Sequence, residues 1–172
     1  GNQGEVCSAG SRLIIQKNIE DDFVKKLIEL SKSMMPGDPF DPNSFMGAVV
    51  DRNQLDKIDS FVNIGLEEGA NLKIGGKKTM ESSGGYYYEP TIFTQVENNM
   101  RIAREEIFGP ILSSISFNDA EEALAIANDS DYGLAAGVWT NNINTAHKMS
   151  KGLRAGTVYV NNYEEGVDTT IP

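Results

Sequence analysis

Residues 111–127, ILSSISFNDAEEALAIA, set the fold class of this 172-residue chain. Residues 111–117 alternate between apolar and polar side chains well enough to predict a strand. From residue 118, with Asn118 as the predicted N-cap, alanine and leucine recur on one face of a helix that runs to residue 127. A short strand joined directly to a helix is the repeating unit of an α/β fold.

The rest of the chain continues this alternation. A helix is predicted after Asn18, where apolar residues recur at helical spacing over 23–30, and a second after Asp51, ending at Gly69. Further strands are expected at residues 13–15, 71–74, 87–93 (interrupted by Pro90), 134–139 and 157–160, and a further helix at residues 144–153. Trp139 is most simply a core residue. The pattern predicts one α/β domain, a three-layer sandwich with a largely parallel sheet.

Composition and charge exclude several classes of function. The chain has 15 Lys and Arg against 25 Asp and Glu, a formal net charge of −10, so it lacks the basic surface that nucleic acids and anionic membranes require. No apolar run approaches the roughly 20 residues of a membrane span. One cysteine and one histidine allow neither an internal disulfide nor a Cys/His zinc cage, so we expect no metal site and a cytoplasmic location.

The single cysteine, Cys7, is the candidate nucleophile. A lone cysteine is more often a small buried apolar residue, but Gly4 and residues 8–10 are small enough to let a substrate reach the sulfur. If residues 8–12 begin a helix, its N-terminal amides would lower the pKa of the thiol and could hold an oxyanion. His147, the only histidine, is expected to be a surface or packing residue, so a Cys–His dyad has little support.

The cysteine segment, NQGEVCSAGSR (residues 2–12), resembles the active-site signature of the NAD(P)-dependent aldehyde dehydrogenases. Four more segments resemble that family in the family's order: GYYYEPTIF (85–93), EEIFGP (105–110), NDSDYGLAAGVWT (128–140) and AGTVYVNN (155–162). Together they cover nearly the whole chain, and several motifs in the right order are far more specific than any one of them.

The resemblance implies that residues 1–172 are the catalytic domain of a longer aldehyde dehydrogenase. Cys7 would attack the aldehyde carbonyl to give a thiohemiacetal, hydride would pass to NAD (NADP is possible), and water would hydrolyse the thioester to the acid. The Cys7 amide would help to stabilise the oxyanion. By the same match, Glu106 would bind the nicotinamide-ribose hydroxyls and Phe108 would pack near the nicotinamide ring. Without the resemblance, Glu106 would be part of a solvated helix end and Phe108 a loop anchor.

The chain departs from the family's pattern at both ends. Gly1 stands where the family usually has an aromatic residue, and no Gly-x-Gly-x-x-Gly loop occurs. The family's dinucleotide-binding domain, general-base glutamate and oxyanion-hole asparagine precede the cysteine, and its oligomerisation tail follows Pro172. We therefore expect an excised piece, inactive alone, of a parent that forms a homodimer or homotetramer. The alternative is a non-catalytic binding or assembly module that retains the fold.

The substrate-binding residues are expected beside the cysteine and in the loop after the last strand. Val6 and Ser8 flank Cys7, and the loop of residues 161–172 contains three acidic residues, of which Glu164 is the first. They would favour a substrate that carries an amine, although a solvated acidic loop is an equally simple interpretation. The Asn-Asn-Tyr start and Thr-x-Pro end of this loop resemble the γ-glutamyl-γ-aminobutyraldehyde dehydrogenases of putrescine breakdown, with betaine-aldehyde and other amino-aldehyde dehydrogenases as near alternatives.

Overall fold

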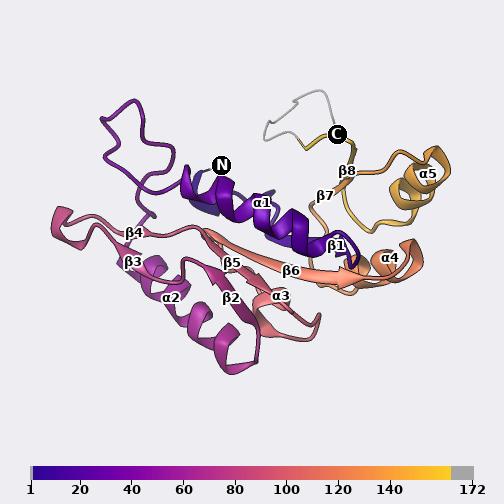
Figure 1. Cartoon of the computed structure of the whole chain (residues 1–172), viewed down its shortest axis with the longest axis horizontal. Coiled ribbons are helices and arrows are strands. Elements are labelled where there is room, and N and C mark those ends of the chain that lie inside the picture. The colour runs from indigo at the N-terminus through magenta and orange to yellow at the C-terminus, as the bar shows by residue number, and fades with distance from the viewer. Residues whose placement is uncertain (1, 164–172) are drawn as a thin grey trace.

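The computed structural model describes residues 2–163. Helices and strands alternate along the chain, as the sequence predicts (Figure 1). The elements are η1 (Asn2–Gly4), β1 (Arg12–Gln16), α1 (Glu20–Lys32), α2 (Arg52–Glu67), β2 (Asn71–Ile74), β3 (Lys78–Thr79), η2 (Glu81–Ser83), β4 (Tyr87–Tyr88), β5 (Thr91–Thr94), α3 (Arg101–Arg104), β6 (Ile111–Phe117), α4 (Ala120–Asn128), β7 (Ala135–Val138), α5 (Ile143–Gly152) and β8 (Thr157–Val160).

The main sheet has four strands in the order β1-β6-β5-β2. The pairings of β1 with β6 and of β5 with β6 are parallel, and only β2, one of the two edge strands, is antiparallel to its neighbour. Strands β7 and β8 form a separate parallel pair, and β3 and β4 a short antiparallel one. The predicted α/β fold with a largely parallel sheet is confirmed, although the strands divide among three sheets.

Helices cover both faces of the main sheet. Helix α1 lies along one face, and α2 and α3 lie along the other (Figure 1). The larger apolar core is on the α2 side, where Ile58 and Phe93 are completely buried. A smaller core joins α4, β7 and α5 through Ala123, Val138 and Met149. All four residues of β5, two of them threonines, are buried, so this strand has no alternating pattern of exposure.

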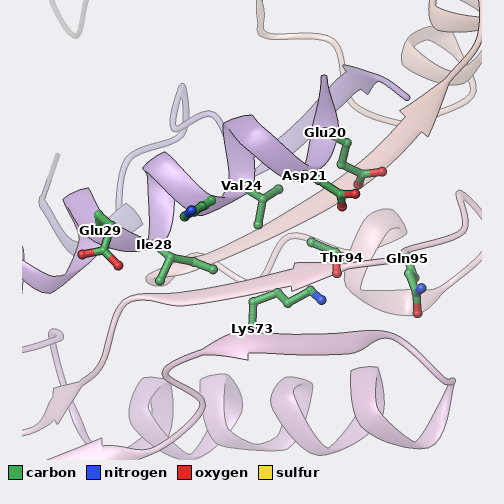
Figure 2. A pocket seen from close by; sticks show the side chains of 9 residues that line it. Glu20, Asp21, Val24, Ile28, Glu29, Lys73, Thr94 and Gln95 are labelled. Carbon is green, nitrogen blue, oxygen red and sulfur yellow. The ribbon is translucent and has the colours of Figure 1, made fainter. Parts of the chain in front are cut away.

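Helix α1 does not pack as its sequence predicts. Of its apolar residues only Val24 is buried, whereas Phe23 is 43% and Leu30 56% exposed. A cavity of about 410 Å³ separates part of the helix from β2 and β5. Figure 2 shows this cavity, with Glu20 and Asp21 of the helix on one side and Lys73 of β2 on the other. Charged side chains from both the helix and the sheet line this cavity, so the expected apolar contact is only partly made.

Two of the predicted helix caps are displaced by one residue. The N-cap of α1 is Ile19, not Asn18, and its side chain makes no capping hydrogen bond. Three acidic residues in the first turn instead interact favourably with the positive end of the helix dipole. Asp119, not Asn118, caps α4, because its backbone is extended and its carboxylate accepts a hydrogen bond from the Glu122 amide at 2.9 Å. The backbone conformation before a helix therefore decides which of two adjacent polar residues becomes the cap.

The caps and breaks around α2 and β5 agree with the sequence. The Asp51 carboxylate accepts a hydrogen bond from the Gln54 amide at 2.8 Å, and Gly69 follows the end of α2 with a φ of 94°. Pro90 separates β4 from β5 as expected. In the part of the chain that the structure describes, no helix has both the length and the apolar character needed to cross a membrane.

Replacing Asp51 with alanine should destabilise the protein by about 1 kcal/mol, because the first turn of α2 loses its side-chain acceptor. Urea unfolding measures the difference. Asp51→Asn is the matched control and should stay within a few tenths of a kcal/mol of the unsubstituted protein, since asparagine caps as well as aspartate. Equal stability of the alanine and asparagine variants would contradict the cap.

Candidate active site

Cys7 lies exposed in a tight turn. The Ala9 amide donates to the Val6 carbonyl oxygen at 2.9 Å, which places Cys7 and Ser8 in the two central positions of the turn. Within residues 2–163 the Cys7 amide donates no hydrogen bond, so it is available to an incoming oxyanion. The thiol and a free donor are therefore presented by the same residue.

The helix considered for residues 8–12 does not form. Residues 8–11 form a turn and an irregular segment, and the chain then enters β1 at Arg12. Arg12 is paired in parallel register with Ser113 of β6, which keeps the segment extended. Since no helix begins at residues 8–12, the condition on which the helix-terminus argument for Cys7 depended is not met.

The segment before Cys7 is anchored on the chain that leads into α2. Gln3 donates through Nε2 to the Ala48 carbonyl oxygen at 2.7 Å, and the Val50 amide donates to Glu5 Oε1 at 3.1 Å. Both contacts join residues 45 positions apart in the sequence. They hold the turn from its N-terminal side.

The loop that contains Glu106 and Phe108 is held on α2. Gln54 Nε2 donates to the carbonyl oxygens of Ile107 and Phe108 at 2.8 and 2.6 Å, and Lys57 Nζ donates to that of Glu106 at 2.8 Å. Ile107 is buried in the larger core, whereas Glu106 is exposed and Phe108 half-buried. The loop thus has a fixed backbone with a carboxylate at its surface and an aromatic ring beside it.

The segment before Cys7 and the loop that contains Glu106 and Phe108 are in direct backbone contact. Gly4 has a φ of 75°, and a Cβ added there would overlap the carbonyl oxygen of Gly109. The contact arises because the loops precede β1 and β6, which are parallel neighbours and begin at the same edge of the sheet. The structure therefore brings the loop of the predicted nucleophile against the loop of the predicted cofactor-binding residues.

A polar network ties the other end of the Cys7 loop to α3 and α4. Arg12 Nη2 donates to Asn98 Oδ1 at 2.5 Å, Asn98 donates to Asp129 Oδ2 at 2.7 Å, and Arg104 Nη1 lies 3.0 Å from the same carboxylate oxygen. Burial lowers the pKa of the Arg12 guanidinium, and the Arg104 hydrogen bond lowers the pKa of the Asp129 carboxyl. The network keeps the start of β1 in place relative to α3, which ends just before the second loop.

The remaining predicted residues are only partly placed. Val6 and Ser8 are half-buried on either side of Cys7 as expected, and Glu164 lies outside the described residues. His147 is exposed on α5. Trp139 is not a core residue: it is 65% exposed and stacks on Tyr163, with the ring centroids 6.3 Å apart. Among residues 2–163 no group of three or more His, Cys, Asp and Glu side chains could hold a metal ion.

Sequence reasoning overlooked the residues that hold the site together. Four side chains hold the loops by hydrogen bonds to segments distant in the sequence, and no local sequence pattern identifies them: Arg12, Gln54, Lys57 and Asn98. Gly4 and Gly109 were visible as glycines, but only the structure shows that each lies against another chain segment.

Replacing Gly109 with alanine should destabilise the protein by about 1–3 kcal/mol, the usual cost of overpacking. The new Cβ would lie 2.5 Å from Ile58 Cδ1, in the completely buried centre of the core. Gly10→Ala is the matched control: nothing lies within 4 Å of its Cβ position, so its effect should stay below about 1 kcal/mol. Thermal or urea unfolding compares the two, and equal losses would show that the loop is not tightly packed on α2.

Comparison with known proteins shows which family this chain matches. The family model described as "Aldehyde dehydrogenase family" matches residues 1–172. An aldehyde dehydrogenase of Enchytraeus buchholzi is 48% identical over 162 residues, which are 94% of this chain and 32% of that protein. The chain thus spans about a third of the length of the curated relatives it matches.

Solved structures agree with the fold closely. The aldehyde dehydrogenase KauB of Pseudomonas aeruginosa is 55% identical with a TM-score of 0.95, and an indole-3-acetaldehyde dehydrogenase in complex with NAD+ is 51% identical with the same score. A γ-glutamyl-γ-aminobutyraldehyde dehydrogenase of Burkholderia cenocepacia is 49% identical with a TM-score of 0.94. Each comparison covers 99% of this chain and 34% of the other.

Proposed function

This chain belongs to the aldehyde dehydrogenase family, and from that premise we propose that it carries the nucleophile of an enzyme that oxidises an aldehyde to a carboxylic acid. The observation that carries the proposal is the contact of the exposed Cys7 turn with the loop of Glu106 and Phe108, through Gly4 and Gly109. A reactive thiol and a surface suited to a cofactor are thereby adjacent. A nucleophilic thiol must stay reduced, which favours a cytoplasmic location.

Cys7 forms and releases the covalent intermediates. Its exposed thiol loses a proton to solvent, and the sulfur adds to the aldehyde carbon to form a C–S bond, while the carbonyl oxygen becomes an oxyanion. The free Cys7 amide is suited to bind that oxygen. After oxidation, water attacks the thioester carbon, the C–S bond breaks, and the acid leaves as the thiolate is restored.

The residues of the second loop fit a dinucleotide. An exposed carboxylate on a fixed backbone can accept hydrogen bonds from two ribose hydroxyls, and a half-buried phenylalanine offers an aromatic surface to a flat ring. Glu106 and Phe108 are therefore proposed to hold the nicotinamide riboside of NAD, with NADP as the alternative. The bound cofactor supplies the two-electron oxidation of the thiohemiacetal to the thioester. Gln54 and Lys57 keep the loop in position.

We propose an amino-aldehyde such as γ-glutamyl-γ-aminobutyraldehyde as the substrate. The support is the acidic residues Glu164, Glu165 and Asp168 in the sequence, together with the similarity to the Burkholderia cenocepacia enzyme. The indole-3-acetaldehyde dehydrogenase is similar to the same degree, so that aldehyde is the natural competitor in an assay. Val6 and Ser8, which flank Cys7, are the side chains proposed to contact the substrate.

Replacing Cys7 with alanine in the intact protein should lower kcat for aldehyde oxidation by about 10⁴-fold or more, because no other group can replace the nucleophile. The assay uses γ-glutamyl-γ-aminobutyraldehyde, with indole-3-acetaldehyde for comparison, and follows NADH formation. The melting temperature and the affinity for NAD should not change, since Cys7 is exposed. Full activity in the variant would overturn the role of Cys7, and an inactive unsubstituted protein with an unreactive thiol would favour a binding or assembly module.

Replacing Glu106 with glutamine should raise the KM for NAD by about 10-fold or more, because a charged acceptor of ribose hydroxyls is lost. Steady-state kinetics with varied NAD concentration measure it. Glu105→Gln is the matched control: the neighbouring carboxylate is also exposed but pairs with Arg101, so its loss should leave the KM for NAD unchanged. Equal effects of the two variants would point to general surface charge instead of a specific contact.

A further inference from the structure

We infer that Tyr163 is a positioning residue that holds the Cys7 turn, an inference that rests on the proposed role of Cys7 as nucleophile. The Tyr163 hydroxyl donates a hydrogen bond to the Ser8 carbonyl oxygen at 2.6 Å, across 155 positions of sequence. Ser8 is the residue after Cys7 and occupies the other central position of the turn. The Tyr163 hydroxyl thus restrains the peptide group between Ser8 and Ala9, one residue beyond Cys7.

Aromatic packing fixes where the phenol points. The Tyr163 ring is stacked on Trp139, with an interplanar angle of 16°, and lies 5.3 Å from the Tyr159 ring between centroids. A Cβ added at Gly137 would lie 2.6 Å from Tyr163 Cδ2 and 2.7 Å from the Trp139 ring, so the absent side chain at Gly137 makes the space that both rings occupy.

The backbone before Tyr163 is clamped as well. Asn161 has a φ of 54°, and its amide donates to the Val138 carbonyl oxygen at 2.7 Å. Its side chain makes two hydrogen bonds with the backbone of Thr140: Oδ1 accepts from the amide at 2.9 Å, and Nδ2 donates to the carbonyl oxygen at 3.0 Å. The segment leaving β8 is therefore attached to the segment leaving β7, and Tyr163 extends from a rigid base.

The hydrogen bond joins two sheets, and within residues 2–163 no strand of one sheet pairs with a strand of the other. The Cys7 turn leads into β1 of the main sheet, whereas Tyr163 follows β8 of the separate β7–β8 pair. The turn has its own Val6–Ala9 hydrogen bond and the anchors of Gln3 and Glu5 on its N-terminal side. Tyr163 holds the turn from its C-terminal side, through Ser8. This additional restraint limits the positions that the Cys7 sulfur and the Cys7 backbone amide can take.

The test removes the hydroxyl and keeps the ring. In the intact protein, Tyr163→Phe should lower kcat for aldehyde oxidation and the rate constant of Cys7 alkylation by iodoacetamide by about tenfold each, as expected for one lost positioning hydrogen bond. The KM for NAD and the melting temperature should stay close to those of the unsubstituted protein. Tyr159→Phe is the matched control, because within residues 2–163 its hydroxyl makes no hydrogen bond, and both rates should be retained.

Different results separate this inference from the proposed function. Unchanged rates in Tyr163→Phe, or equal losses in the two phenylalanine variants, would overturn the positioning role while the activity of Cys7 stands. An unsubstituted protein that oxidises no aldehyde, but whose Cys7 is alkylated tenfold faster than that of Tyr163→Phe, would overturn the enzymatic function and support the hydrogen bond. A drop in kcat with a parallel rise in the KM for NAD would indicate general loosening of the fold and also overturn the inference.

Discussion

The parallel pairing of β1 with β6 is the constraint on which the candidate site depends. Its register, from Arg12 opposite Ser113 to Gln16 opposite Phe117, starts both strands at one edge of the sheet. The loops that precede them must therefore meet there, although about a hundred residues separate them in the chain. Strand β6 lies inside the sheet, between β1 and β5, and helices lie along both faces of the sheet (Figure 1).

Backbone contacts and side-chain hydrogen bonds fix how the two loops lie against each other. Gly4 lies against the Gly109 carbonyl, so two main chains approach with no side chain between them. Gln54, on a helix capped by Asp51, holds the second loop through two carbonyl oxygens. Ordinary secondary structure thus sets the geometry of the candidate site, and the Cys7 thiol is exposed at a turn.

Local patterns in the sequence predicted most elements, although the caps expected at Asn18 and Asn118 are displaced by one residue, whereas contacts between distant segments were not predicted. Alternation and proline placed β6, the break at Pro90 and β8 correctly, because these depend on neighbouring residues alone. No helix forms over residues 8–12, because residues 8–11 form a turn and an irregular segment and Arg12 is already paired with β6. The apolar periodicity of α1 correctly indicated a helix, but whether Phe23 and Leu30 are covered depends on what lies beside the helix, which periodicity does not contain. Trp139 was misplaced for the same reason, since its partner Tyr163 comes from another strand end.

The α/β class follows from the order and types of the amino acids. The proposals of Cys7 as nucleophile and of Glu106 and Phe108 as cofactor-binding residues also come from the sequence, because motifs are short-range patterns. The tertiary structure alone decided which loops adjoin and which residues hold them: Gly4 against Gly109, Arg12 with Asn98, and Tyr163 with Ser8. These contacts join segments 86 to 155 positions apart. Periodicity and composition describe a residue's own element, and only the packing of elements against one another specifies its distant neighbours.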